Sequence, residues 1–173
     1  MPRKPKVEPR AARERPRARP LDELDRRILT LLQQDASVSS AELARRVGLS
    51  PAGLQKRVRK LQDAGVIVRH VALLDREAID LDLLCFVQVT LAHHQPDAVA
   101  GFRAAIQGMA EVLECHHLTG EFDYLLKVVV ANHRELEHFL VDALTPAPGV
   151  DKIRTSIVLS EIKASTALPL RDP

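Results

Sequence analysis

Aromatic side chains are scarce in this chain of 173 residues, which contains no Trp, one Tyr and four Phe. Surfaces that stack RNA bases and sites that bind sugars depend on aromatic faces. The composition therefore argues against both classes of site. Hydrophobic residues make up 46% of the chain and charged residues 28%, as is typical of a soluble globular protein with one domain or two small ones.

Long apolar runs and cysteines are also few. No run approaches the 18 or so consecutive apolar residues that a membrane helix needs, so the sequence predicts no membrane partner. The two cysteines, Cys85 and Cys115, match neither a zinc nor a redox spacing. We interpret them as buried thiols in a reducing compartment, in preference to a single disulfide.

The run Cys115-His116-His117 raises two further hypotheses, which its spacing disfavours. Successive strand residues point to opposite faces, so one metal site cannot easily use all three side chains, even with His93-His94 nearby. A hydrolase built on Cys115, His117 and Asp123 lacks a glycine-rich oxyanion loop. We therefore predict no metal, no cofactor and no enzymatic activity.

The net charge of +2 conceals an asymmetry along the chain. Residues 1–20 carry eight basic and two acidic side chains, a net charge of +6, and residues 21–75 carry a net charge of +2. Residues 76–173 carry a net charge of −6. A chain that is basic in its first half and acidic in its second suggests a polyanionic partner for one end only.

Residues 1–20 also contain five of the eleven prolines and almost no large apolar side chain. Such a segment cannot bury enough surface to offset its ordering entropy. We interpret it as a disordered basic arm, which has no secretory signal because it lacks an apolar stretch. Two roles stay open for the arm: a phosphate-binding element and a solubilising tail.

The segment after the arm contains three helix signals. Apolar residues at helical spacing predict a first helix within residues 21–34. A capping-box pattern, Ser39 with Glu42, opens a second helix that ends at Gly48. A serine followed by proline, Ser50-Pro51, then begins a third helix that runs to about residue 63. Two short helices joined by a tight turn predict a helix-turn-helix, whose second helix enters the major groove of double-stranded DNA.

The third helix is where we expect DNA contact. Its face opposite the apolar stripe is basic, and no acidic residue occurs from Ser50 to Gln62. We place Arg57 on the flank of the helix, nearer a phosphate than a base, and Arg69 on the segment that follows. A merely solvated charged face is the alternative interpretation. The predicted DNA-contacting residues are Ser50, Pro51, Ala52, Gln55, Lys56, Arg57, Arg59, Lys60 and Arg69.

The remaining patterns indicate a mixed second module. Residues 66–74 are β-like, consistent with a wing or a strand that leads onward. Strand, helix, strand, strand, helix and strand patterns then follow, at residues 83–92, 97–109, 111–119, 122–131, 133–145 and 152–162. This order is the ferredoxin-like βαββαβ plan, so we expect an α+β fold. One layer of helices leaves the other sheet face without a partner, and the apolar run 126–130 favours dimerisation through the sheet.

Several strings, spread in order over residues 21 to about 170, resemble the Lrp/AsnC (feast/famine) family of regulators. The second-half strings are most similar to leucine-responsive members, and residues 1–20 lie outside the resemblance. The strings are Leu21–Leu29 (LDELDRRIL), Glu42–Pro51 (ELARRVGLSP), Arg57–Leu61 (RVRKL), Gly65–Ile67 (GVI), Glu114–His116 (ECH), Thr119–Lys127 (TGEFDYLLK) and Pro148–Val150 (PGV).

The resemblance implies a winged helix-turn-helix DNA-binding domain over residues 21–75, a linker over 76–82 and an amino-acid-sensing RAM domain over 83–170. Family members form dimers that assemble further, often into octamers. They bind their effector near a loop that corresponds here to Thr119–Tyr124. We therefore expect a cytoplasmic, nucleoid-associated transcriptional regulator of a bacterium or archaeon. An architectural protein that wraps DNA with little ligand control is the alternative.

The chemistry of this loop suits an amino acid. Gly120 allows backbone N–H groups to approach a carboxylate, and Glu121 or Asp123 can pair with an ammonium group. An ordinary hairpin tip is the alternative interpretation. We expect leucine or another apolar amino acid as the effector. The predicted effector-binding residues are Leu118, Thr119, Gly120, Glu121, Phe122, Asp123, Tyr124 and Leu136.

Overall fold

The computed structural model describes residues 20–170, which belong to two compact units that we treat separately. Unit 1 is the chain up to Ala72 together with the segment that begins at Ser165, and unit 2 is Leu73–Ala164. The predicted arm, apart from Pro20, lies outside the described residues. The predicted linker 76–82 falls inside unit 2, and residues 165–170, which we had assigned to the second domain, belong to unit 1.

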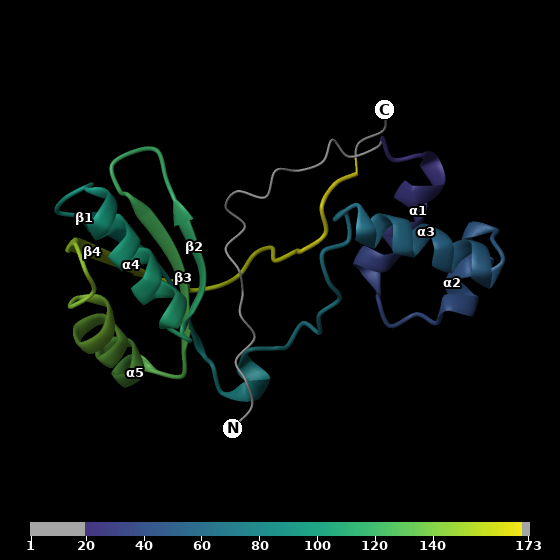
Figure 1. The fold of residues 1–173 in the computed structure, drawn as a ribbon. Coiled ribbons are helices and arrows are strands. Elements are labelled where there is room, and N and C mark those ends of the chain that lie inside the picture. Colours follow the sequence, from purple (N-terminus) through teal and green to yellow (C-terminus); the bar gives the residue numbers. More distant parts are fainter. Residues whose placement is uncertain (1–19, 171–173) are drawn as a thin grey trace, which may run out of the picture. The chain divides into compact units, whose positions relative to one another are not determined.

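Unit 1 contains three helices, α1 (Glu23–Gln34), α2 (Ser40–Val47) and α3 (Pro51–Asp63) (Figure 1). The predicted caps close α2 and α3: Ser39 Oγ accepts a hydrogen bond from the Glu42 N–H at 3.2 Å, and Ser50 Oγ accepts one from the Gly53 N–H at 3.1 Å. These bonds satisfy N–H groups that the first turn of a helix leaves without a partner. Between the two helices, Gly48 has a φ of +72°, which favours glycine.

Apolar side chains from all three helices meet in one core in unit 1. Each fully buried leucine or isoleucine contributes about 1.5–3 kcal/mol to folding through loss of apolar surface from water. Leu24, Leu32 and Val58 are partly buried and pack against this core. The buried members are Ile28, Leu29, Leu43, Ala44, Val47, Leu54 and Leu61.

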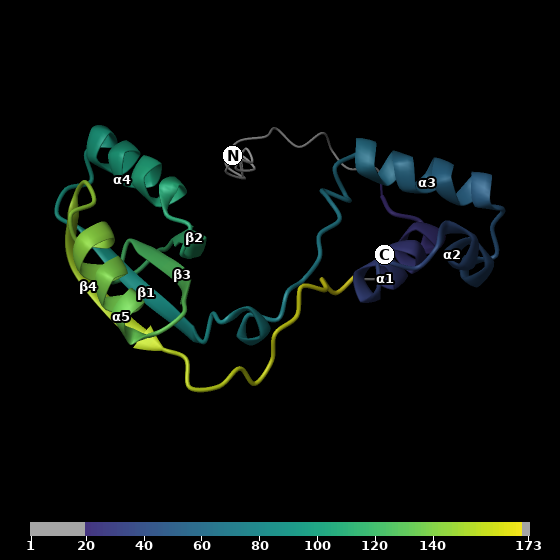
Figure 2. The ribbon, with the colours of Figure 1, turned by 90° about the horizontal axis from the view of Figure 1, so that it is seen from below.

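The C-terminal segment is held against α1 by a single glutamine. The Gln33 side-chain amide donates to the carbonyl of Leu168 at 3.2 Å and accepts from its N–H at 2.7 Å, as a neighbouring strand would. Leu170 packs on the core of unit 1. Figure 2 shows this segment, in yellow, ending beside α1. Residues 165–170 therefore pack against the helices of unit 1. No local pattern in the sequence of these residues predicts that contact.

Residues 66–74 form no strand in the described part of the chain, although their sequence pattern is β-like. Val66 and Ile67 donate backbone hydrogen bonds to the carbonyl of Leu61, which turns the chain back on the end of α3. Beyond them the apolar side chains Val68, Leu73 and Leu74 are 72–75% exposed. A β-like pattern becomes a strand only when a neighbouring strand pairs with its backbone groups, and residues 20–170 provide none here.

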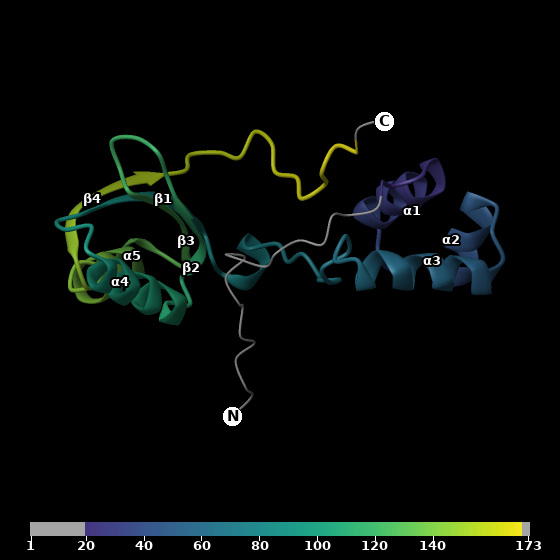
Figure 3. The same ribbon diagram turned by 45° about the horizontal axis from the view of Figure 1, so that its top comes forward.

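Unit 2 is a four-stranded antiparallel sheet with helices on one face, which confirms the α+β, ferredoxin-like plan (Figure 3). The strands lie in the order β2-β3-β1-β4. A short 3₁₀ turn, η1, precedes the sheet. In chain order the elements are η1 (Glu77–Ile79), β1 (Leu83–Leu91), α4 (Pro96–Gly108), β2 (Val112–His117), β3 (Tyr124–Val130), α5 (His133–His138), the wider π-helical turn η2 (Phe139–Leu144) and β4 (Val150–Ile157).

The last strand is shorter than its pattern suggests. β4 pairs with β1 up to Cys85–Ile157, and the Val158 N–H makes one more hydrogen bond, to the Leu84 carbonyl. β1 begins at Leu83, so the alternation that continues to residue 162 has no remaining backbone to pair with. β4 therefore ends at Ile157 because β1 offers no further partner, although the alternating sequence pattern continues to residue 162.

The core of unit 2 lies between the sheet and its helices. Leu126, Val128 and Val130 of β3 face this core and are fully buried, so they cannot serve an outer interface as we had expected. Phe102 of α4 and Leu144 of η2 cover them from the helix side, each with no exposed surface. The opposite sheet face carries Phe86, which is 38% exposed. An apolar run does not reveal which face of a sheet its residues occupy, because that depends on the helices.

The two cysteines differ in their surroundings. Cys85 is fully buried in the core of unit 2, and burial raises the pKa of its thiol. Cys115 is exposed on β2, so the prediction of two buried thiols is wrong for this residue. β2 is at the edge of the sheet, which leaves the side chain uncovered. Within the described part of the chain, no helix combines the length and the apolar character that crossing a membrane requires.

Candidate DNA-contacting surface and effector loop

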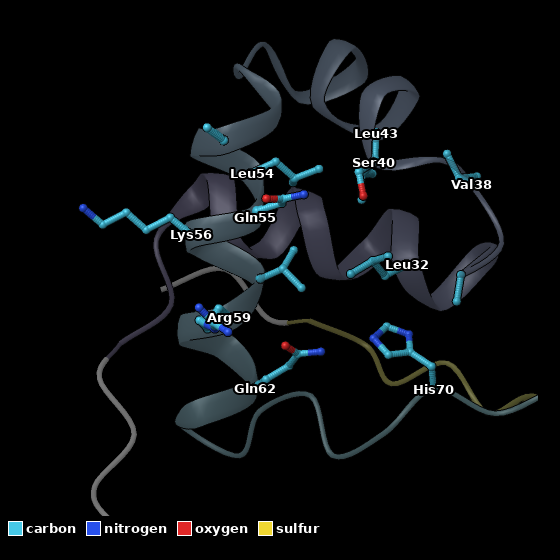
Figure 4. Close-up of a pocket in the computed structure, with 13 residues that line it drawn as sticks. Leu32, Val38, Ser40, Leu43, Leu54, Gln55, Lys56, Arg59, Gln62 and His70 are labelled. Atoms are coloured by element: carbon cyan, nitrogen blue, oxygen red, sulfur yellow. The ribbon is translucent and has the colours of Figure 1, made fainter.

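The outward face of α3 borders a depression of about 630 Å³, shown in Figure 4. Four residues spaced three and four apart, Ala52, Gln55, Arg59 and Gln62, line it along one side of the helix. Ser40 at the start of α2 and His70 after α3 lie across from them. The depression thus brings together amide, guanidinium, hydroxyl and imidazole groups, all able to hydrogen-bond with base edges or phosphates.

Three exposed cations of α3 have no carboxylate partner in the part of the chain that the structure describes. Within residues 20–170, Lys56, Arg59 and Lys60 take part in no salt bridge, whereas Arg45 and Arg46 of α2 both pair with a glutamate. A cation without an internal partner is available to a phosphate. Ser50, Pro51 and Ala52 are also exposed at the N-terminus of α3, which is the end that a recognition helix presents to DNA.

Arg57 has a structural role, which corrects its assignment as a phosphate contact. Its Nη1 lies 2.7 Å from Asp22 Oδ2 and 2.8 Å from Asp25 Oδ1, so it joins α3 to the start of α1. These two carboxylates, Asp22 first, raise the pKa of the Arg57 guanidinium. Asp22 Oδ1 also accepts the Asp25 N–H at 2.7 Å, which makes it the N-cap of α1. A cation held in this way is less available to a phosphate than an unpaired one.

We therefore expect Arg57→Ala to lower the free energy of unfolding of unit 1 by about 1–2 kcal/mol, through the loss of two half-exposed ion pairs and of packing by the arginine stem. DNA affinity of the protein that remains folded should change little. Urea denaturation followed by circular dichroism measures the first effect, and titration of DNA below the unfolding transition measures the second. Unchanged stability together with weakened DNA binding would restore the phosphate-contact assignment.

Gly53 lies in the first turn of α3, where glycine is unfavourable for a helix. A Cβ at this position would come within 3.2 Å of the Ser50 hydroxyl that caps the helix. Glu42 holds the equivalent position behind the Ser39 cap of α2, so a side chain fits beside such a cap and the cap does not by itself require glycine. Arg69, in contrast, is exposed on the irregular segment after α3, and its predicted contact with the DNA backbone is a proposal.

The predicted effector loop connects β2 to β3 and is tied to the end of β1. The Leu118 N–H donates to the Asp123 carbonyl at 2.9 Å, and the Asp123 N–H donates to the Val89 carbonyl at 3.1 Å. Leu118, Thr119, Gly120 and Glu121 are exposed, and Gly120 has a φ of +148°. No atom lies within 4 Å of the position that a Gly120 Cβ would occupy, so the backbone there is open to a ligand.

Asp123 orders this loop, which corrects its assignment as a partner for an ammonium group. Its Oδ2 accepts the Leu91 N–H at 2.7 Å, and its Oδ1 lies 2.7 Å from His94 Nε2. The Leu91 N–H, and after it His94, hold the pKa of Asp123 below its ordinary value. Both carboxylate oxygens are therefore engaged. The partner of Asp123 is His94 and not His117, which argues against the Cys115–His117–Asp123 relay.

Tyr124 and Leu136 do not line the loop. Tyr124 is 2% exposed. Its ring is tilted against Phe102, with centroids 4.7 Å apart, and stacked on His117, with centroids 4.9 Å apart. Leu136 is 6% exposed in the core beneath α5. Neither side chain is open to a ligand in this structure. No group of three or more His, Cys, Asp or Glu side chains in the described residues is placed to hold a metal ion.

Sequence reasoning missed residues at both sites. Gln62 lies one turn after Arg59, and the helical spacing that selected Gln55 could have found it. His70 and His94 carry no such signal, because only the fold brings them to the depression and to the loop. Arg154 is similar: its guanidinium carbon lies 5.4 Å from the centre of the Phe122 ring, across 32 residues of sequence.

Known proteins combine the same two units. The leucine-responsive regulatory protein of Haemophilus influenzae is 41% identical over 158 residues, which cover 91% of this chain and 95% of that protein. The Lrp/AsnC ligand binding domain matches residues 84–168, and a winged helix-turn-helix DNA-binding domain matches residues 21–68. The chain belongs to the Lrp/AsnC family. The recognition made from the sequence strings is thereby confirmed.

Solved structures of Lrp/AsnC regulators share the fold of this family member. A transcriptional regulator of Neisseria meningitidis in complex with L-methionine aligns with a TM-score of 0.84 at 39% identity, over 87% of this chain and 97% of that one. A feast or famine regulatory protein of M. tuberculosis, also in complex with L-methionine, aligns with a TM-score of 0.78 at 33% identity, over 86% and 99% of the two chains.

Proposed function

We propose that this Lrp/AsnC protein regulates transcription by binding double-stranded DNA through α3 of unit 1 and an apolar amino acid at the β2–β3 loop of unit 2. The observation that carries the DNA-binding part is the set of three cations, Lys56, Arg59 and Lys60, which are exposed on a capped helix and have no internal carboxylate partner. The remaining DNA contacts come from Ser50, Pro51, Ala52, Gln55 and Arg69.

The ligand is an apolar amino acid of the leucine or methionine class. Relatives named for leucine and complexes that contain L-methionine support this class. In this chain Leu118 is 38% exposed and Phe122 is half-buried beside the open backbone of Gly120. An aliphatic side chain can contact these two residues while the backbone N–H groups of the loop face the carboxylate.

The working assembly is a homodimer that forms octamers, present in the cytoplasm with the nucleoid. The sheet face that α4 and α5 leave uncovered supports this proposal, because it carries the exposed Phe86 and the half-buried Leu125. A sheet with one solvent-facing apolar side is commonly covered by a second subunit.

Calorimetric titration of the full chain with each of the twenty amino acids tests the function. We expect heat of binding for one or more apolar amino acids, and a shift in DNA affinity when that amino acid is added. Absence of binding by every apolar amino acid, under conditions where DNA binds, would contradict amino-acid sensing. That result would favour the architectural alternative, in which the basic arm and a multimeric assembly wrap DNA with little ligand control.

A further inference from the structure

One cation of unit 2 stands beside the β2–β3 loop without a carboxylate partner. Arg154 is in the middle of β4, opposite Gln88 of β1. Its neighbours Ile153 and Thr155 are opposite Val89 and Val87, which are buried under the helices, so Arg154 is on the uncovered sheet face. It lies on the edge strand β4, outside the two central strands whose Phe86 and Leu125 are proposed to meet a second subunit. There its guanidinium carbon lies 5.4 Å from the centre of the Phe122 ring.

This stacking leaves the hydrogen-bonding edge of the guanidinium free. A guanidinium over an aromatic ring is attracted to the negative face of the ring and needs no N–H···O hydrogen bond there, so its donors stay available. In residues 20–170, Arg154 takes part in no salt bridge and donates no side-chain hydrogen bond. The side chain is exposed as well. A planar carboxylate fits such an edge through two parallel hydrogen bonds.

The same loop carries one free anion. Both oxygens of Asp123 are engaged by the Leu91 N–H and His94, which leaves Glu121 as the carboxylate of the loop that is exposed and in no salt bridge with a described residue. Arg154 contacts Phe122, the residue next to Glu121. The loop therefore has a cation in contact with Phe122 and an exposed anion on the adjacent residue, one for each charge of an amino-acid zwitterion.

We propose that Arg154 binds the α-carboxylate of the amino acid and that Glu121 binds its ammonium group. This inference rests on the proposed function, and it names the charged groups that select an amino acid over an apolar compound of the same size. The contact with Phe122 holds the guanidinium in position before the ligand arrives. Because the ring already restricts the arginine side chain, the contact lowers the entropic cost of ordering it on binding.

The test compares Arg154→Gln with the unaltered full chain, using L-methionine, L-leucine and the two corresponding amino-acid amides as ligands in NMR titrations. The amides keep the ammonium group and the side chain but lack the carboxylate. We expect the unaltered chain to prefer each amino acid over its amide by at least about tenfold, and Arg154→Gln to weaken amino-acid binding by about 10- to 100-fold. In Arg154→Gln, the ratio of the affinity for each amino acid to the affinity for its amide should fall to about one.

Lys152→Gln is the matched control, because Lys152 is an exposed cation two residues earlier on the same face of β4. Lys152→Gln should keep the preference for the amino acids over their amides. Both variants should keep the DNA affinity that the unaltered chain has without ligand. A preference that survives Arg154→Gln overturns the inference. So does an equal loss for acid and amide, which would mean that Arg154 only positions Phe122. If the unaltered chain binds DNA but no amino acid, the proposed function itself fails, and this inference fails with it.

Discussion

Arg59→Ala should weaken binding of the full chain to a specific DNA site by about 1–3 kcal/mol, or roughly 5- to 150-fold. Arg59 lines the depression on the outer side of α3, is exposed and has no carboxylate partner among the described residues. It lies between Gln55 and Gln62 on the same stripe, so the proposed contact brings its guanidinium to the groove together with two amides. The free energy of unfolding should not change, since no contact within unit 1 is lost.

The measurement is the affinity for two duplexes of the same length. One contains a site that the unaltered chain selects from random DNA, and the other is unselected. Arg59→Ala should reduce the difference in affinity between these two duplexes, because a base contact contributes only to the selected site. An equal loss on both duplexes would show that Arg59 contacts a phosphate. Arg57→Ala is a useful companion variant, because it removes the same charge only two residues away, from a side chain that Asp22 and Asp25 hold.

Deleting residues 1–20 should flatten the dependence of DNA affinity on salt. A protein that neutralises phosphates releases counterions, and the slope of log affinity against log salt changes by about 0.9 for each phosphate contact. The arm carries eight of the 25 lysines and arginines of the chain. If half of them contact DNA, the slope falls by between three and four, and affinity at low salt falls by orders of magnitude.

A control of equal length, with glutamine at the eight basic positions, separates charge from chain length. It should behave as the deletion does. A slope that is unchanged in both variants would identify the arm as a solubilising tail. A slope that changes only in the deletion would mean that chain length or the prolines contribute to DNA binding in place of charge.

Local signals in the sequence were sufficient where the interaction partner lies within a few residues. A cap such as Ser39 or Ser50 bonds to an N–H three residues away, so its role can be inferred from spacing alone. The same holds for Pro51 at the start of α3 and Gly48 at the end of α2. The order of strands and helices also followed from periodicity, because alternation and helical spacing report which faces are buried.

The roles of charged side chains were harder to infer, since a cation can pair with DNA or with its own chain. Helical periodicity places Arg57 on the flank of α3 but still predicts a DNA contact for it, as for Lys56 and Lys60. The structure shows that Arg57 alone meets Asp22 and Asp25, which are more than 30 residues away. Asp123 is a parallel case at the loop. Its partners come from the end of β1, and only the register of β1 with β3 brings them within reach.

The sequence by itself determined that this chain has a capped helix-turn-helix, a βαββαβ module after it and the strings of the Lrp/AsnC family. Short-range bonds and the periodic burial of apolar residues specify these features. Tertiary structure alone decided which cations are free, that Asp123 is engaged, that Arg154 meets Phe122, and that residues 165–170 return to Gln33. Each of these depends on groups distant in sequence, whose meeting is set by sheet register and core packing and not by any local pattern.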